Sequence, residues 1–204
     1  MTDILRTSFF STVAQMQAEM HGDSWGNPVL YGDEGAGSVQ PGEAWLLYGL
    51  VRALRPERIL EIGTGYGFST LHLAQAIKEN DRGRVWTVEV RADRQAEARR
   101  WVRAAKLEGL VTFLASVPTP EELPTVDFLF LDAVHNAVAV SLYLSLVKPR
   151  LTANAVVVAH DGNYDDHARQ GMALAGMKGW QSLVLPGTSR GGMAIFSKGE
   201  TGEG

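Results

Sequence analysis

Apolar residues along the chain fall into two alternating patterns. Longer stretches repeat their apolar positions with a helical period, and short runs are apolar almost throughout. The short runs predict strands buried on both faces, at Arg58–Ile62, Val85–Val90, Val111–Ala115, Val126–Leu131, Ala155–Ala159, Ser182–Leu185 and Met193–Ser197. Strands of this kind alternating with helices are typical of a parallel sheet covered by helices on each side.

The helical stretches complete this α/β pattern. They predict helices over 3–20, 41–54, 68–77, 94–106, 136–147 and 164–176, with Asp3 and Asp93 as caps. Only a glycine-rich loop, 186–192, separates the last two strands, so we expect them to be antiparallel neighbours. The expected fold is a doubly wound, mostly parallel seven-stranded sheet whose last strand is antiparallel.

Three regions follow from this layout. Residues 1–40 are expected to form an N-terminal helix followed by a lid or cap, since 21–40 is a long polar connection rich in glycine. Residues 41–197 form the predicted α/β domain. Residues 198–204 are predicted to be a disordered tail.

Composition narrows the functional classes. The 204 residues are 45% hydrophobic, contain no cysteine and carry a formal net charge of −4. The lack of cysteine excludes disulfides and thiolate chemistry, and the lack of a basic excess disfavours a nucleic-acid partner. No apolar run approaches the ~20 residues that span a bilayer, and the polar N-terminus predicts no signal peptide. We therefore expect a cytoplasmic protein without a membrane partner, in which the apolar N-terminal helix can pair across a homodimer.

Alternate glycines follow the first strand. Glu61 precedes Gly63, Gly65 and Gly67, which allow a sharp turn and a close backbone approach to a ligand. Phe68 stands where a dinucleotide fingerprint would need its third glycine, and no Gly-Lys-Ser/Thr follows for a P-loop. An acid at the end of the second strand, Glu89, lies 22 positions after Gly67 and can accept both hydroxyls of a ribose. A nucleotide-type cofactor site is the resulting prediction.

The E-x-G-x-G-x-G pattern resembles the first motif of class I S-adenosylmethionine-dependent methyltransferases. Residues 39–43, ahead of a helix, and 60–63 look like the small-molecule O-methyltransferases related to catechol and caffeoyl-CoA methyltransferases. The resemblance extends over about 38–197 and implies a Rossmann-like methyltransferase fold that binds S-adenosylmethionine. The cofactor contacts that it implies are Val39, Glu61, Gly63, Thr64, Gly65, Gly67, Ser69, Glu89, Ser116 and Asp132.

Two acids, Asp132 and Asp161, end the fourth and fifth predicted strands. The carboxyl ends of neighbouring parallel strands open on one crevice, and paired carboxylates there suit a divalent cation such as Mg²⁺. The resembling enzymes hold magnesium with an Asp at each strand end and an Asn beside the second. Here Gly162 follows Asp161 and the Asn comes one position later, so the predicted ligands are Asp132, Asp161 and Asn163.

A histidine three residues after Asp132 is the candidate general base. His135 stands where the catechol enzymes have a lysine, and an imidazole can accept a proton near neutral pH. His135 and Asp132 are therefore the predicted catalytic residues, although a helix-start histidine that only bonds Asp132 is the simpler alternative. His160 is either a neighbour that supports Asp161 or a neutral buried histidine.

The predicted function is methyl transfer from S-adenosylmethionine to a hydroxyl of a small, catechol-like molecule, assisted by a divalent metal. Methylation of a hydroxyl on a tRNA base is one alternative. A cofactor-binding protein without transfer activity is another, because Gly162 separates Asp161 from the Asn that the resembling enzymes have directly beside it. A nicotinamide dehydrogenase is a third, against which Phe68 argues.

Overall fold

The computed structural model describes residues 4–20, 39–161, 166–186 and 192–198, and their strands form one mixed sheet. The strand order is β3-β2-β1-β4-β5-β7-β6. The bounds are β1 (Arg58–Ile62), β2 (Arg84–Val88), β3 (Val111–Leu114), β4 (Val126–Leu131), β5 (Leu151–His160), β6 (Trp180–Leu185) and β7 (Met193–Lys198). β7 runs antiparallel to both β5 and β6, so the predicted α/β fold with an antiparallel last strand is confirmed.

The helices are α1 (Ile4–Met20), α3 (Pro41–Leu54), α4 (Phe68–Asn80), α5 (Ala92–Ala104), α6 (Ala137–Val147) and α7 (His167–Leu174), with short 3-10 turns at Glu108–Leu110 and Lys148–Arg150. Within the part of the chain that the structure describes, no helix is long and apolar enough to cross a membrane.

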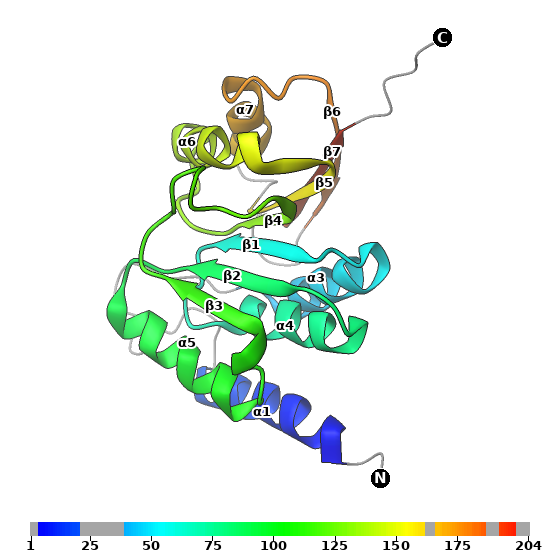
Figure 1. Ribbon diagram of the computed structural model, residues 1–204, viewed down its shortest axis with the longest axis vertical. Helices are drawn as coiled ribbons and strands as arrows, with labels where there is room; N and C mark the ends of the chain where they lie inside the picture. Colours follow the sequence, from blue (N-terminus) through cyan, green and yellow to red (C-terminus); the bar gives the residue numbers. More distant parts are fainter. Residues whose placement is uncertain (1–3, 21–38, 162–165, 187–191, 199–204) are drawn as a thin grey trace. The chain divides into compact units, whose positions relative to one another are not determined.

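The chain divides into two compact units. The described residues within Met1–Glu57 and Thr64–Ala115 form the first unit, and those within Arg58–Gly63 and Ser116–Gly204 form the second. In the first unit, α1 packs against α4 and α5, and α3 packs against α4 (Figure 1). In the second unit, β1, β4 and β5 pair in parallel, and α6 packs against α7. The division of the chain into cap, domain and tail, and the homodimer, stay predictions.

Several element bounds differ from the sequence prediction. α5 begins at Ala92 with Arg91 as its cap, and Asp93, expected to open the helix, lies in its first turn. β2 ends at Val88, two residues early, because the Glu89 side chain accepts the backbone N–H of Arg91 and turns the chain. Lys198, expected in the tail, is the last residue of β7.

One further strand is longer than predicted. β5 extends from Leu151 rather than Ala155, through a partly exposed segment whose polar residues hid it from the apolar pattern. The predicted cap Asp3, the lid over 21–38 and the remainder of the tail over 199–204 lie outside the described residues.

Helix α4 is buried along most of its length and carries an imidazole into the core of the first unit. His72 is fully buried, and its ring lies 5.4, 5.0 and 4.8 Å from the rings of Phe9, Trp45 and Phe68, measured between centroids. Burial lowers the pKa of His72 from 6.5 to about 4, and the hydrogen bond with the Phe68 carbonyl opposes this only in part. His72 is therefore neutral near pH 7.

The lowered pKa of His72 makes the protein sensitive to acid. The unfolded chain binds a proton near pH 6.5 and the folded chain only near pH 4, so the stabilisation is complete above pH 6.5 and is lost as the pH falls toward 4. The expected loss of unfolding free energy over that window is roughly 3 kcal/mol. Chemical denaturation of the wild type and of His72→Phe at pH 7 and pH 4.5 measures it.

The phenylalanine variant keeps the aromatic packing and removes the titration. It also removes Nε2 of His72, which has no hydrogen-bond partner among the described residues. We expect His72→Phe to lose clearly less stability than the wild type between the two pH values. Equal losses would show that His72 does not cause the acid sensitivity.

Candidate functional site

The turn after β1 lies against the backbone at the end of β4. Gly63 has φ +107°, and a Cβ built on it would lie 1.9 Å from the carbonyl oxygen of Asp132. The N–H of Asp132 donates to the carbonyl of Ile62 at 2.8 Å, which holds the two strand ends together. Only glycine satisfies both the dihedral angle and the close approach. Gly63 is therefore what allows the end of β1 to lie this close to the backbone of Asp132.

A hydrogen bond joins Gly65 to Glu89 in the first unit. The N–H of Gly65 donates to Oε2 of Glu89 at 2.9 Å, and the N–H of Arg91 donates to Oε1 at 2.9 Å. Glu89 is 8% exposed, and its own N–H donates to the carbonyl of Leu114 on the neighbouring strand β3. Two backbone donors thus orient the carboxylate, and each oxygen keeps a lone pair for a further donor.

Gly67 is the N-cap of α4 and allows that helix to approach α5. Its φ is +91°, and a Cβ at this position would lie 2.9 Å from the Cβ of Ala98. Thr64 closes the turn by accepting the N–H of Gly67 at 2.9 Å, and its hydroxyl lies 2.5 Å from that of Thr87. The N–H of Thr64 donates to the carbonyl of Val88 at 3.0 Å, so its hydroxyl and both of its backbone polar groups have partners within the protein.

The remaining predicted cofactor residues differ in exposure. Val39 and Glu61 are fully buried, and Ser69 is 3% exposed in the first turn of α4. Ser116 is exposed just after β3. Each of these positions stays a prediction as a cofactor contact.

The pairing of β4 with β5 brings two polar side chains together in the second unit. Leu131 is opposite Ala159 in the parallel register, so the next residues, Asp132 and His160, face each other at the carboxyl ends of the strands. Nδ1 of His160 lies 3.0 Å from Oδ1 of Asp132, and both side chains are 8% exposed. Oδ1 of Asp132 nevertheless accepts no hydrogen bond from any described residue, because the alignment with His160 is unsuitable.

His135 and Asp161 extend this cluster. Nε2 of His135 lies 3.8 Å from Oδ1 of Asp132, and Nδ1 lies 3.4 Å from Oδ2 of Asp161. Asp161 has φ +53°, a left-handed conformation that aspartate tolerates better than most residues. The structure thus brings together Asp132, His135 and Asp161, as the sequence predicted. The side chain of His135 is the most exposed of the three, at 37%.

The predicted magnesium ligands fit the described residues only in part. Asn163 and Gly162 lie outside them, so the expected third oxygen ligand is not described. Asp132, His135 and His160 instead offer ligand atoms that all lie within 4.8 Å of one another. Mg²⁺ prefers oxygen ligands, whereas imidazole suits transition metals, so this set does not match the magnesium site that the resemblance implied.

Two residues have larger structural roles than the sequence indicated: His160 at the end of β5, and Gln95 on α5. His160, considered only as a supporting or buried histidine, is adjacent to Asp132; aligning β4 with β5 so that both strand ends coincide would have found it. Gln95 on α5 donates to the carbonyls of both Glu89 and Leu114, at 3.2 and 3.0 Å, and joins the ends of β2 and β3. No sequence pattern distinguished Gln95 from its polar neighbours on α5.

Comparison with known proteins identifies the family. A family described as "Methyltransferase domain" matches residues 60–162, half of the chain. The chain belongs to this family. The matched segment includes the glycine turn, Glu89 and the ends of β4 and β5. The predicted resemblance to class I S-adenosylmethionine-dependent methyltransferases is confirmed at the level of family and fold.

Solved structures share the fold over nearly the whole chain. An O-methyltransferase from Bacillus cereus, in complex with SAH, is 22% identical with a TM-score of 0.67 and covers 96% of this chain and 92% of its own. The O-methyltransferase TomG from Streptomyces achromogenes, involved in tomaymycin synthesis and in complex with SAM, is 22% identical with a TM-score of 0.66 and covers 94% of this chain and 90% of its own.

A relative in sequence is the "Uncharacterized protein y4gI" of Sinorhizobium fredii. It is 31% identical over 147 residues, which cover 62% of this chain. The chain spans only 16% of the length of that relative.

Proposed function

We propose that the protein transfers the methyl group of S-adenosylmethionine to a hydroxyl of a small, catechol-like molecule. The observation that supports this most is the convergence of Asp132, His135 and Asp161 at the ends of β4 and β5 in a member of the methyltransferase family. An imidazole between two carboxylates is suited to remove a proton from a hydroxyl, because the carboxylates stabilise the imidazolium that results.

The chemistry requires alignment and one proton acceptor. The hydroxyl oxygen attacks the methyl carbon, the oxygen–carbon bond forms as the carbon–sulfur bond breaks, and S-adenosylhomocysteine leaves with the electron pair on sulfur. The hydroxyl proton passes to His135, the most exposed side chain of the three. Asp132 and Asp161 orient His135 from either side. A divalent cation held beside Asp132 is a second proposed way to assist this step, because when bound it would lower the pKa of the hydroxyl.

For the cofactor, we propose that Glu89 binds the ribose and that the backbone around Gly63 and Gly65 contacts the cofactor. Gly65 and Arg91 hold the Glu89 carboxylate in place before any ligand arrives, so little ordering is needed on binding. A carboxylate that accepts two hydroxyl donors forms charge-assisted hydrogen bonds. These bonds make Glu89 the most sensitive side chain for cofactor affinity.

Glu89→Ala is expected to weaken S-adenosylmethionine binding by about 10- to 100-fold, since hydrogen bonds to a charged group contribute about 1.5–3 kcal/mol. Isothermal titration calorimetry with S-adenosylmethionine and with NAD measures this and separates the two cofactor classes. The proposal requires the wild type to bind S-adenosylmethionine and not NAD.

The matched control for Glu89 is Asp93→Ala. Asp93 is an acid four positions later whose side chain is 65% exposed and pairs with Arg91 at 2.8 Å. Its removal should leave the affinity within about twofold, as is usual for exposed ion pairs. Equal affinity of the Glu89→Ala variant and the wild type would remove Glu89 from the cofactor site.

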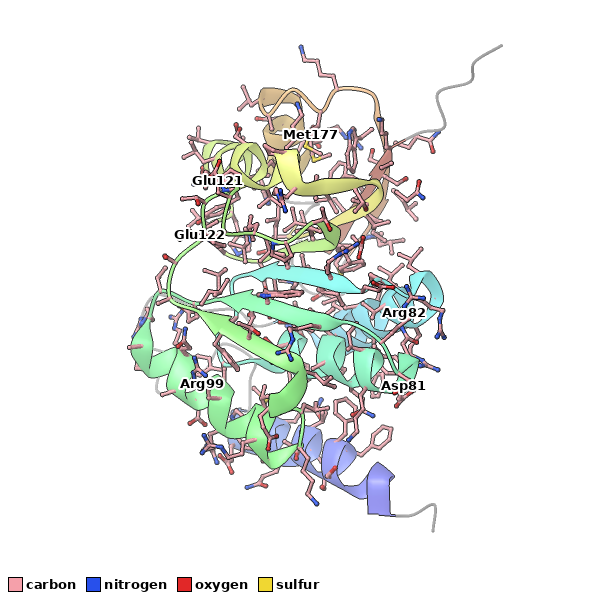
Figure 2. The ribbon with its side chains drawn as sticks, in the orientation of Figure 1. Asp81, Arg82, Arg99, Glu121, Glu122 and Met177 are labelled. Atoms are coloured by element: carbon pink, nitrogen blue, oxygen red, sulfur yellow. The ribbon has the colours of Figure 1, made fainter. Side chains whose placement is uncertain are left out.

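Methylation of a tRNA base is the less supported alternative, because two arginines of α5 are engaged within the first unit. Arg100 pairs with Glu19 at 2.8 Å, and the guanidinium of Arg99 lies 4.4 Å from the ring centroid of Phe113. Arg99 projects from α5 (Figure 2). A mobility-shift assay with total tRNA tests this alternative, and we expect no shift at physiological salt. A protein that binds the cofactor without transfer would instead show calorimetric binding and no product with any hydroxylated acceptor.

A further inference from the structure

The side chains at the ends of β4 and β5 form a two-histidine cluster, defined here as Asp132, His135 and His160, with Asp161 beside it. We propose that this cluster binds a divalent transition-metal ion such as Zn²⁺ in preference to Mg²⁺. The inference rests on the proposed function, whose cation it assigns to a chemical class. The prediction of an all-oxygen site is thereby replaced by one with two imidazole ligands.

The distances match a common ion. Metal–nitrogen and metal–oxygen bonds of about 2.0–2.1 Å in tetrahedral geometry place ligand atoms about 3.3 Å apart. Oδ1 of Asp132 lies 3.0 Å from Nδ1 of His160 and 3.8 Å from Nε2 of His135, values that bracket this separation. The three ligand atoms are all within 4.8 Å of one another. A small shift of the exposed His135 ring would make the separations between the three ligand atoms nearly equal.

A buried oxygen without a hydrogen bond supports the assignment independently of the distances. The Asp132 side chain is 8% exposed, and its Oδ1 accepts no hydrogen bond from any described residue, although an imidazole nitrogen lies 3.0 Å away. Burying an unsatisfied carboxylate oxygen is costly unless a cation compensates it. The misaligned contact with His160 is the arrangement expected of two ligands that point at a third atom rather than at each other.

Asp161 completes the arrangement from outside the cluster. If Nε2 of His135 faces the ion, its Nδ1–H points toward Oδ2 of Asp161 at 3.4 Å. A ligating histidine usually donates its other N–H to a carboxylate, which fixes the tautomer and strengthens the ligand. Asp161 is therefore a positioning residue for His135. With an ion bound His135 is a ligand, so the proton-acceptor role proposed above applies to the metal-free protein.

The chemistry of the ligands decides the class of ion. Two imidazoles and one carboxylate, with positions left open, are typical of catalytic zinc and of non-haem iron. Mg²⁺ demands near-ideal octahedral oxygen coordination and keeps its water. We therefore expect Zn²⁺ to bind at least about 100-fold more tightly than Mg²⁺ to the full-length chain.

The test is calorimetric titration of chelator-stripped protein with Zn²⁺ and, separately, with Mg²⁺. The proposal predicts one equivalent of Zn²⁺ that millimolar Mg²⁺ does not displace. Titration with Co²⁺ as a visible probe provides a second readout on the wild type that needs no variant. Absence of Zn²⁺ binding, or displacement by equimolar Mg²⁺, would overturn the proposal.

Three histidine variants locate the site. His135→Gln and His160→Gln should each weaken Zn²⁺ binding at least about tenfold, because each removes one ligand. His167→Gln is the matched control: its ring centroid lies 6.0 Å from that of His135, yet it is outside the two-histidine cluster. Equal Zn²⁺ affinity of all three variants would refute the assignment, and circular dichroism confirms that each is folded.

Titration of the same samples with S-adenosylmethionine separates this inference from the proposed function. Cofactor binding and methyl transfer without any Zn²⁺ binding would refute the metal site and leave the methyltransferase function standing. Zn²⁺ binding at the cluster without cofactor binding would support the metal site and refute the methyltransferase function.

Discussion

His135→Ala is expected to lower turnover by about 10²–10⁴-fold, the usual contribution of a group that handles a proton in the transition state. The affinity for S-adenosylmethionine should stay within about twofold, because the Glu89 carboxylate is held by the backbone N–H groups of Gly65 and Arg91 rather than by His135. Steady-state kinetics with an acceptor that the wild type methylates measures turnover, and calorimetry measures the affinity for S-adenosylmethionine. The expected separation of a large effect on turnover from a small effect on cofactor binding is what defines a role in the acceptor chemistry.

The control for His135 is its neighbour Val134, which is 52% exposed and carries no polar group. Val134→Ala should keep turnover close to that of the wild type. If His135→Ala also kept it, His135 would be no more than a residue at the start of a helix that contacts Asp132 and Asp161, and the proposed proton transfer would have to be assigned elsewhere.

Gly63→Ala is expected to have the largest effect on stability, a loss of about 3–5 kcal/mol of unfolding free energy. The new Cβ would lie 1.9 Å from the carbonyl oxygen of Asp132, and φ +107° is unfavourable for alanine. The new Cβ and the carbonyl oxygen are both attached directly to the backbone, so no side-chain rotation can separate them and the end of β4 would have to move. Urea denaturation followed by circular dichroism measures the loss.

A second glycine serves as the control for this substitution. Gly49 lies within α3 at an exposed position, and a Cβ there meets no atom within 4 Å. Gly49→Ala should therefore stabilise the protein by about 0.4–1 kcal/mol, because alanine lowers the entropy of the unfolded chain. Similar unfolding free energies for both variants would contradict the close approach of Gly63 to Asp132.

The parts of the site that the sequence predicted are those that depend on strand ends. Glu89 and Asp132 were identifiable because an acid directly after a buried apolar run lies where ligands bind in a parallel sheet. Their partners were not identifiable, because they depend on register. His160 meets Asp132 only when β4 and β5 are aligned so that Leu131 faces Ala159.

The order of the last two strands shows the same limit. β6 and β7 were both predicted, but their sequence does not state which one pairs with β5. In the structure the more buried β7 lies between β5 and β6, and the largely exposed β6 is at the edge. The apolar content of β7 indicated that this strand is buried, but which strands lie on either side of it is decided only in the folded sheet.

The most direct test of the central claim is product analysis with S-adenosylmethionine whose methyl group is deuterated. The protein is incubated with catechols, monophenols and aliphatic alcohols, and the products are examined by mass spectrometry. We predict a labelled methyl group on a hydroxyl oxygen of at least one acceptor, with one S-adenosylhomocysteine formed per product. Binding of the cofactor with no label on any oxygen, or with label on nitrogen or carbon instead, would contradict the account.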